Sequence, residues 1–112
     1  MSRNLTLYLD DILTSIEKIE RYTANMNQIS FMADERTIDA VSHNLQIIGE
    51  AVKKIPAELR DRYPQIEWRK IAGLRDTIAH AYFSIDDEII WDIVENKLTE
   101  LRDCIAIVKA DL

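Results

Sequence analysis

Apolar residues recur at intervals of three and four along most of this chain, which is the spacing of helices that bury one face. The pattern predicts a first helix from about Asn4 to Tyr22. A second helix is predicted to begin near Asp34, a residue type that favours helix N-caps, and residues 25–28 are predicted to separate the two. The apolar stripe of the second helix consists of Ile38, Val41, Leu45, Ile48, Val52 and Ile55.

Two prolines predict where the next elements begin and end. Pro56 ends the second helix and opens a short helix over residues 57–63, which Pro64 ends in turn, because proline cannot continue a helix and disfavours helical backbone before it. A third helix is predicted over residues 66–82. The last begins after Ser84 and continues nearly to the C-terminus.

Length and composition fit one helical domain. Of 112 residues, 47% are hydrophobic and only two are Gly and two Pro, too few for the many tight turns of an all-β fold. We therefore predict a single all-α domain over residues 1–112, an antiparallel four-helix bundle with a short extra helix. Gly49 lies inside the second helix, where it costs about 1 kcal/mol against Ala, so we expect another backbone to approach it closely.

Charge and cysteine content restrict the functional classes. No apolar run reaches the ~20 residues of a membrane span, the N-terminal residues do not resemble a secretory signal, and the single Cys104 cannot form an internal disulfide. We expect a cytoplasmic protein in which Cys104 is packed. The net charge of −6 argues against a general nucleic-acid coat protein. Any action on RNA would need a local basic cleft or would be transient and weak.

Arg75, Asp76, His80 and Tyr82 bring candidate chemistry into eight residues of the third helix. Arg binds phosphate through two parallel hydrogen bonds, and His gives and takes protons near neutral pH. Together they could cleave a phosphodiester without a metal. Judged by spacing alone, an Arg, an Asp and a His near the end of a surface helix more often form a solvated face with salt bridges than a catalytic site. A tyrosine in the position of Tyr82 is more often a residue at the edge of an amphipathic helix than a modification site.

Helical geometry limits how these side chains can meet. Arg75 and Tyr82 fall within ~20° of each other, but Arg75 and His80 point ~140° apart in a regular helix. The arginine could wrap around, the helix could loosen near His80, or two copies could meet across a two-fold axis. We favour a homodimer, because it would bring two histidines, one base and one acid, into one groove.

Other polar and aromatic residues have simpler interpretations. We interpret His43 as surface or dimer rim, and Trp68 and Trp91 as anchors of the core or of an interface. Asn44 and Glu50 lie off the apolar stripe and could face the cleft. No His, Cys and acidic residues have the spacing of metal ligands, so no metal site is predicted.

The pattern Arg75-x4-His80-x-Tyr82 resembles the Arg-x4-His-x-Tyr signature of HEPN ribonucleases, and more narrowly of the HepT toxins. Residues 8–13, 39–51 and 68–74 also look like that family. The resemblance covers essentially the whole chain.

The resemblance implies a homodimeric, metal-independent endoribonuclease, the toxin of a type VII toxin–antitoxin pair. Its partners would be RNA and a minimal nucleotidyltransferase antitoxin of the MntA type. Arg75 would bind the scissile phosphate, His80 would act as base or acid, and Asp76 would orient His80 or raise its pKa. The toxin would need no cofactor. The antitoxin would use ATP to transfer AMP to Tyr82, and this anionic group would occupy the phosphate site and repel RNA.

Two other functions are compatible with these residues. The chain could be a noncatalytic partner subunit of a nucleotidyltransferase that presents a substrate or binds nucleotides, which the net charge of −6 favours. It could also be a purely structural dimerisation bundle, in which Arg75 and His80 would affect neither RNA nor nucleotide binding.

Overall fold

Every secondary-structure element in the described part of the chain is a helix, which confirms the predicted all-α class. In the computed structural model, residues 4–79 and 87–112 are described, and for residues 76–79 only the helical backbone. The helices are α1 (Leu5–Tyr22), α2 (Gln28–Met32), α3 (Glu35–Val52), α4 (Ala57–Arg60), α5 (Trp68–Ala79), α6 (Asp87–Asn96) and α7 (Leu98–Ala110).

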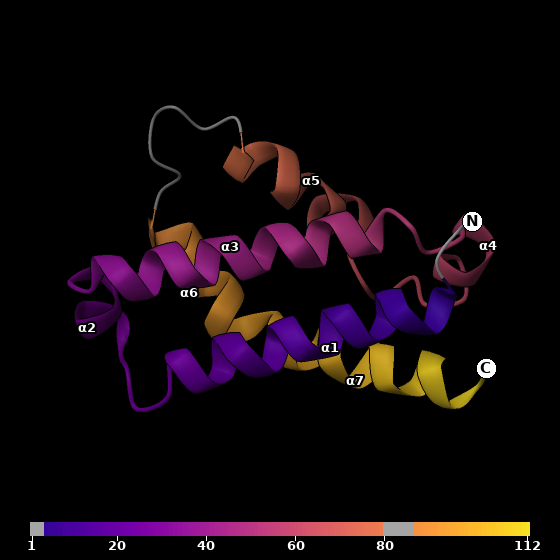
Figure 1. The fold of residues 1–112 in the computed structure, drawn as a ribbon, viewed down its shortest axis with the longest axis horizontal. Coiled ribbons are helices and arrows are strands. Elements are labelled where there is room, and N and C mark those ends of the chain that lie inside the picture. Colours follow the sequence, from indigo (N-terminus) through magenta and orange to yellow (C-terminus); the bar gives the residue numbers. More distant parts are fainter. Residues whose placement is uncertain (1–3, 80–86) are drawn as a thin grey trace.

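Helix α3 lies in the middle of the bundle. It packs most extensively against α1 and α5, and α1 also packs against α7. Figure 1 shows α3 along the length of the molecule, antiparallel to both α1 and α5. Four residues of its predicted stripe, Val41, Leu45, Ile48 and Val52, are fully buried.

Side-chain caps explain where the two longest helices begin. Asn4 accepts a hydrogen bond from the backbone N–H of Thr6 (2.8 Å), and Asp34 accepts one from the N–H of Thr37 (3.1 Å). The prediction of an N-cap at Asp34 is confirmed. The hydrogen bonds from Thr37 favour the ionised carboxylate and hold the pKa of Asp34 below its usual value.

Between α1 and α3 the structure differs from the sequence prediction. Residues 25–28 were predicted to form only a break, but Gln28 begins the short helix α2. The turn itself uses Asn25, whose φ of 65° lies in the left-handed region that asparagine tolerates. Asn27 and Ser30 then cap α2 reciprocally, each side chain bonding the other's backbone N–H.

Three predicted boundaries around the prolines are shifted. α3 ends at Val52, because the N–H groups of residues 54 and 55 bond to carbonyl groups three residues earlier instead of four. Ile55 lies beyond the end of the helix but is still buried. α4 ends at Arg60 instead of residue 63, and α5 begins at Trp68 instead of residue 66. Residues 80–82, the predicted end of the third helix, lie outside the described residues.

The last predicted helix is two helices, α6 and α7, separated at Lys97. The bend has a tertiary cause, since α6 packs against α2 whereas α7 packs against α1. Trp91 of α6 meets Phe31 of α2 with ring centroids 5.1 Å apart. Trp91 and Trp68 are both buried, which confirms their interpretation as core anchors.

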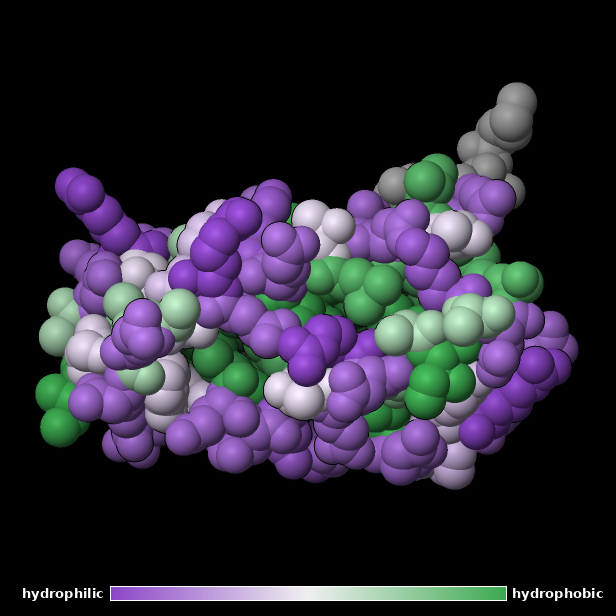
Figure 2. Space-filling view, turned by 90° about the horizontal axis from the view of Figure 1, so that it is seen from below, coloured by the Kyte–Doolittle hydropathy of each residue, from purple (hydrophilic) through white to green (hydrophobic). Residues whose placement is uncertain are grey.

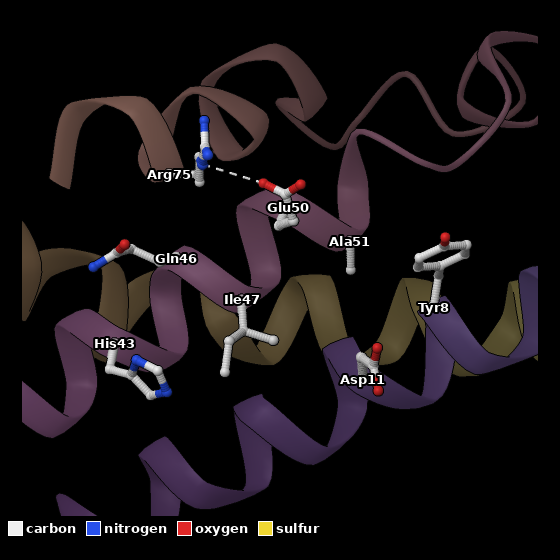
Figure 3. Close-up of a pocket in the computed structure, with 8 residues that line it drawn as sticks. All are labelled: Tyr8, Asp11, His43, Gln46, Ile47, Glu50, Ala51 and Arg75. Atoms are coloured by element: carbon white, nitrogen blue, oxygen red, sulfur yellow. Dashed lines mark ion pairs between the residues drawn. The ribbon is translucent and has the colours of Figure 1, made fainter. Parts of the chain in front are cut away.

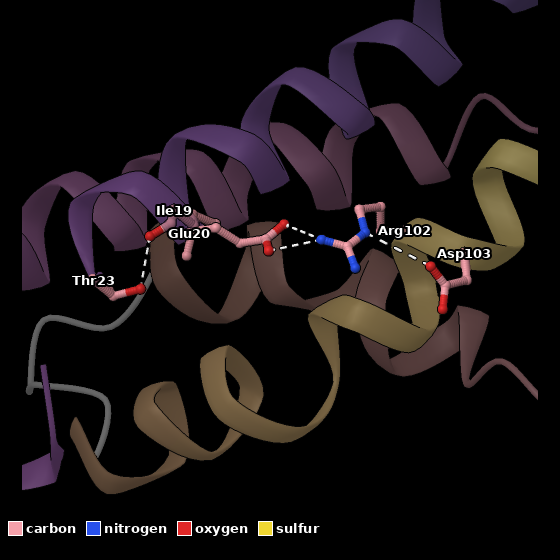
Figure 4. A network of polar contacts seen from close by, with 5 residues as sticks. All are labelled: Ile19, Glu20, Thr23, Arg102 and Asp103. Carbon is pink, nitrogen blue, oxygen red and sulfur yellow. Dashed lines mark hydrogen bonds and ion pairs between the residues drawn. The ribbon is translucent and has the colours of Figure 1, made fainter. Parts of the chain in front are cut away.

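Ion pairs connect the exposed sides of α1 and α7. Arg102 donates two hydrogen bonds to the carboxylate of Glu20, at 2.7 and 2.8 Å (Figure 4), and Lys109 lies 2.6 Å from Asp10. Such exposed pairs each stabilise a fold by at most about 1 kcal/mol. The apolar core therefore contributes most of the stability.

Figure 2 shows the molecule from below the view of Figure 1, with hydrophobic residues at the surface between hydrophilic ones. None of the described helices is long and apolar enough to cross a membrane. Cys104 is packed as predicted, and its burial raises the pKa of the thiol. A thiol that is hard to ionise is a poor nucleophile.

Candidate functional site

Helices α3 and α5 approach each other closely at Gly49. A Cβ atom at this position would lie 2.9 Å from the backbone nitrogen of Arg75 and 2.9 Å from the carbonyl oxygen of Ile71. Only glycine therefore fits without a shift of one helix. This confirms the predicted close approach of another backbone, and it identifies that backbone as the part of α5 that carries Arg75.

The next residue of α3, Glu50, forms an ion pair with Arg75. Its Oε2 atom lies 3.2 Å from the Nε atom of Arg75, as the dashed line in Figure 3 shows. The two side chains are 53% and 45% exposed, so water screens the pair and it adds little to stability.

Arg75 and Glu50 stand at one end of an open groove of about 300 Å³ between α1, α3 and α5. Five of its residues share one face of α3, at spacings of three and one, and Figure 3 shows two more on the facing side of α1. Glu50 and His43 are seven residues apart, about 10 Å along the helix axis. The groove is lined by Tyr8, Asp11, His43, Gln46, Ile47, Glu50, Ala51 and Arg75.

The described part of this groove is not strongly basic. Its ionisable side chains are one guanidinium, one imidazole, one phenol and the carboxylates of Asp11 and Glu50. A polyanion would therefore be held here through directed contacts with Arg75 instead of through a general positive field. The described lining residues therefore do not form the local basic cleft that was one of the two expectations for action on RNA.

The structure places only part of the predicted catalytic group. Arg75 lies in the groove, and the backbone of Asp76 belongs to α5, but the side chain of Asp76 and all of His80 and Tyr82 lie outside the described residues. Whether Arg75 and His80 converge therefore stays a prediction. In the described residues, no group of three or more His, Cys, Asp or Glu could hold a metal ion.

Neighbouring residues of α3 differ in their relation to the groove. His43 is exposed, as predicted, and also lines the groove. Asn44, expected to be able to face the cleft, is buried and donates to the carbonyl oxygen of Ala40 at 2.9 Å. Sequence reasoning did not identify Tyr8 and Asp11 as site residues, although both lie in the stretch 8–13 that resembles the family. They line the groove because α1 packs against α3.

Comparisons with known proteins give a consistent result. A family model described as "Ribonuclease HepT-like" matches residues 12–108. The chain is 40% identical over 108 residues to "Putative RNase MJ0127" of Methanocaldococcus jannaschii, which covers 96% of this chain and 89% of the relative. It is 39% identical over 102 residues to "Probable ribonuclease HepT" of Thermococcus cleftensis, covering 91% and 93%.

A third relative is longer. "Gamma-glutamylcyclotransferase and putative RNase MJ0434" of Methanocaldococcus jannaschii is 35% identical over 112 residues, and the match spans the whole chain but only 50% of that protein. No solved structure matches the chain.

Proposed function

Because the chain belongs to the HepT-like ribonuclease family, we propose that it is a metal-independent endoribonuclease that acts as a homodimer. The observation that supports this most directly is the placement of Arg75. Its guanidinium lines an open groove, and its backbone is packed against Gly49. A cation held in this way is suited to bind one phosphate of a flexible strand.

In the proposed reaction, the ribose 2′-oxygen attacks the adjacent phosphorus and the bond to the 5′-oxygen of the next nucleotide breaks. One His80 takes the 2′-hydroxyl proton, and His80 of the second copy gives a proton to the leaving oxygen. Arg75 stabilises the charge that develops on the phosphorane oxygens. The products are a 2′,3′-cyclic phosphate and a 5′-hydroxyl, and Asp76 orients His80.

The purified chain is expected to cleave single-stranded RNA in excess EDTA, because the proposed reaction uses only side chains. Mapping the ends of the products should give cyclic phosphates and 5′-hydroxyls. Absence of cleavage at any protein concentration would favour the other function, a noncatalytic binding subunit of a nucleotidyltransferase. The acidic residues of the groove and the net charge of −6 are what favour that alternative.

We further propose that a minimal nucleotidyltransferase antitoxin silences this toxin by modifying Tyr82. The tyrosine oxygen would attack the α-phosphorus of ATP, forming an AMP ester and releasing pyrophosphate. The added anion would compete with RNA for Arg75 and repel its phosphates.

Coexpression with the proposed nucleotidyltransferase antitoxin is expected to increase the intact mass of the chain by one or more AMP units, and Tyr82→Phe should prevent the increase. The measurement is intact mass spectrometry of both variants, with RNA cleavage assayed alongside. A neutralised complex in which Tyr82 carries no AMP would mean that the antitoxin acts by covering the groove.

A further inference from the structure

Glu50 lies opposite Arg75 because the preceding residue, Gly49, packs against the backbone of α5. Gly49 packs against the backbone of Arg75 and Ile71. A Cβ atom added at Gly49 would lie 2.9 Å from the backbone nitrogen of Arg75 and 2.9 Å from the carbonyl oxygen of Ile71. This contact sets the register of α3 against α5 and leaves little freedom in the distance between residues 50 and 75. The backbone packing therefore holds residues 50 and 75 at a separation that their side chains can bridge, and the ion pair forms across it.

In the ion pair, Glu50 faces the Nε side of the Arg75 guanidinium. Oε2 of Glu50 lies 3.2 Å from Nε of Arg75. In Figure 3 the outermost part of the guanidinium extends away from Glu50. An arginine recognises phosphate best through two parallel N–H groups in a fixed plane, so the group that fixes this plane affects how phosphate is received.

We propose that Glu50 is a positioning residue for Arg75: its carboxylate, bound to Nε, holds the guanidinium plane so that the terminal nitrogens meet the scissile phosphate. This inference builds on the proposed ribonuclease function. The carboxylate also repels RNA, so Glu50 disfavours binding of the substrate while it favours the transition state. The two effects are separable, because the first changes KM and the second changes kcat.

The test compares Glu50→Ala and Glu50→Gln with a matched control, Glu67→Gln. Glu67 is also a half-exposed acid in ion pairs, 2.7 Å from Lys70 and 3.7 Å from Lys97, but it does not line the groove of Arg75. Its substitution changes the net charge equally. Kinetics of RNA cleavage and thermal unfolding are measured for all three variants and the parent.

Glu50→Ala is expected to lower kcat by about tenfold to a hundredfold, the range expected when a reacting group is misplaced by about 1 Å, with KM unchanged or lower. Glu50→Gln should lose less, because its amide oxygen can occupy the position beside Nε that Oε2 of Glu50 occupies. Glu67→Gln should match the parent, and all unfolding temperatures should agree within a few degrees. If Glu50→Ala proves unstable, the isosteric Glu50→Gln carries the comparison.

Arg75→Ala separates failure of this inference from failure of the proposed function. If Arg75→Ala cleaves RNA as fast as the parent, the proposed reaction is wrong. If Arg75→Ala is inactive and both Glu50 variants keep the kcat and KM of the parent, the reaction stands and the positioning role is wrong. Equal losses of kcat in the Glu50 and Glu67 variants would also contradict it, because they would indicate a general effect of charge.

Discussion

Replacing His80 with alanine is expected to lower kcat for RNA cleavage by about 10²- to 10⁴-fold, the usual contribution of a general acid or base. The loss should be near the upper end, because each active site of the proposed dimer uses two copies of His80. RNA affinity should change little, since Arg75 provides the phosphate contact. The measurement is single-turnover cleavage beside an RNA-binding assay, and the arrest of growth on expression of each variant.

His43 provides the comparison for this prediction, because the chain has two histidines and His43 lines the groove. If His43→Ala abolishes cleavage and His80→Ala does not, the catalytic imidazole has been assigned to the wrong residue. If His80→Ala arrests growth as strongly as the parent chain, His80 has no part in the reaction.

Gly49→Ala is expected to destabilise the fold and to reduce cleavage. The new Cβ atom would lie 2.9 Å from two backbone atoms of α5, which cannot rotate away as a side chain could. Overpacking of this kind typically costs about 1–3 kcal/mol, which should exceed the ~1 kcal/mol that alanine gains over glycine within a helix. Displacement of α5 would also move Arg75, so cleavage should fall even in the fraction that remains folded.

Gly73→Ala is the matched control, because Gly73 also lies within a helix but its Cβ would meet no atom of the described residues within 4 Å. This substitution should raise the free energy of unfolding by up to about 1 kcal/mol. Urea unfolding of both variants, with cleavage measured at a temperature where each is folded, makes the comparison. If Gly49→Ala is as stable as Gly73→Ala, the close approach of the two helices is not needed for the fold.

Local sequence signals predicted the long helices well and the short connections poorly. The apolar stripe of α3 and the cap at Asp34 depend only on residues that are close in sequence. The segment itself therefore contains the information needed to predict the helix and its start. The bend at Lys97 depends on two surfaces that are distant in sequence, since Trp91 packs on Phe31 and the following helix packs on α1. No local pattern marks such a bend.

The same distinction applies to the site. Arg75 could be identified from its residue type and spacing, and Gly49 indicated a close helix contact. That Gly49 meets the backbone of Arg75, and that Glu50 thereby faces its guanidinium, depends on the register between α3 and α5. Tyr8 and Asp11 became visible as lining residues only once α1 was packed beside α3.

The two walls of the groove should tolerate evolutionary change unequally. On the wall formed by α3 and α5, the two backbones lie close together at Gly49. A larger residue at this position would therefore both displace Arg75 and disturb the packing of the core. On the opposite wall, Tyr8 and Asp11 are half-buried residues of α1 whose side chains line the groove. Exchanging either of these two side chains would therefore change the shape and chemistry of the groove without displacing the backbone that carries Arg75.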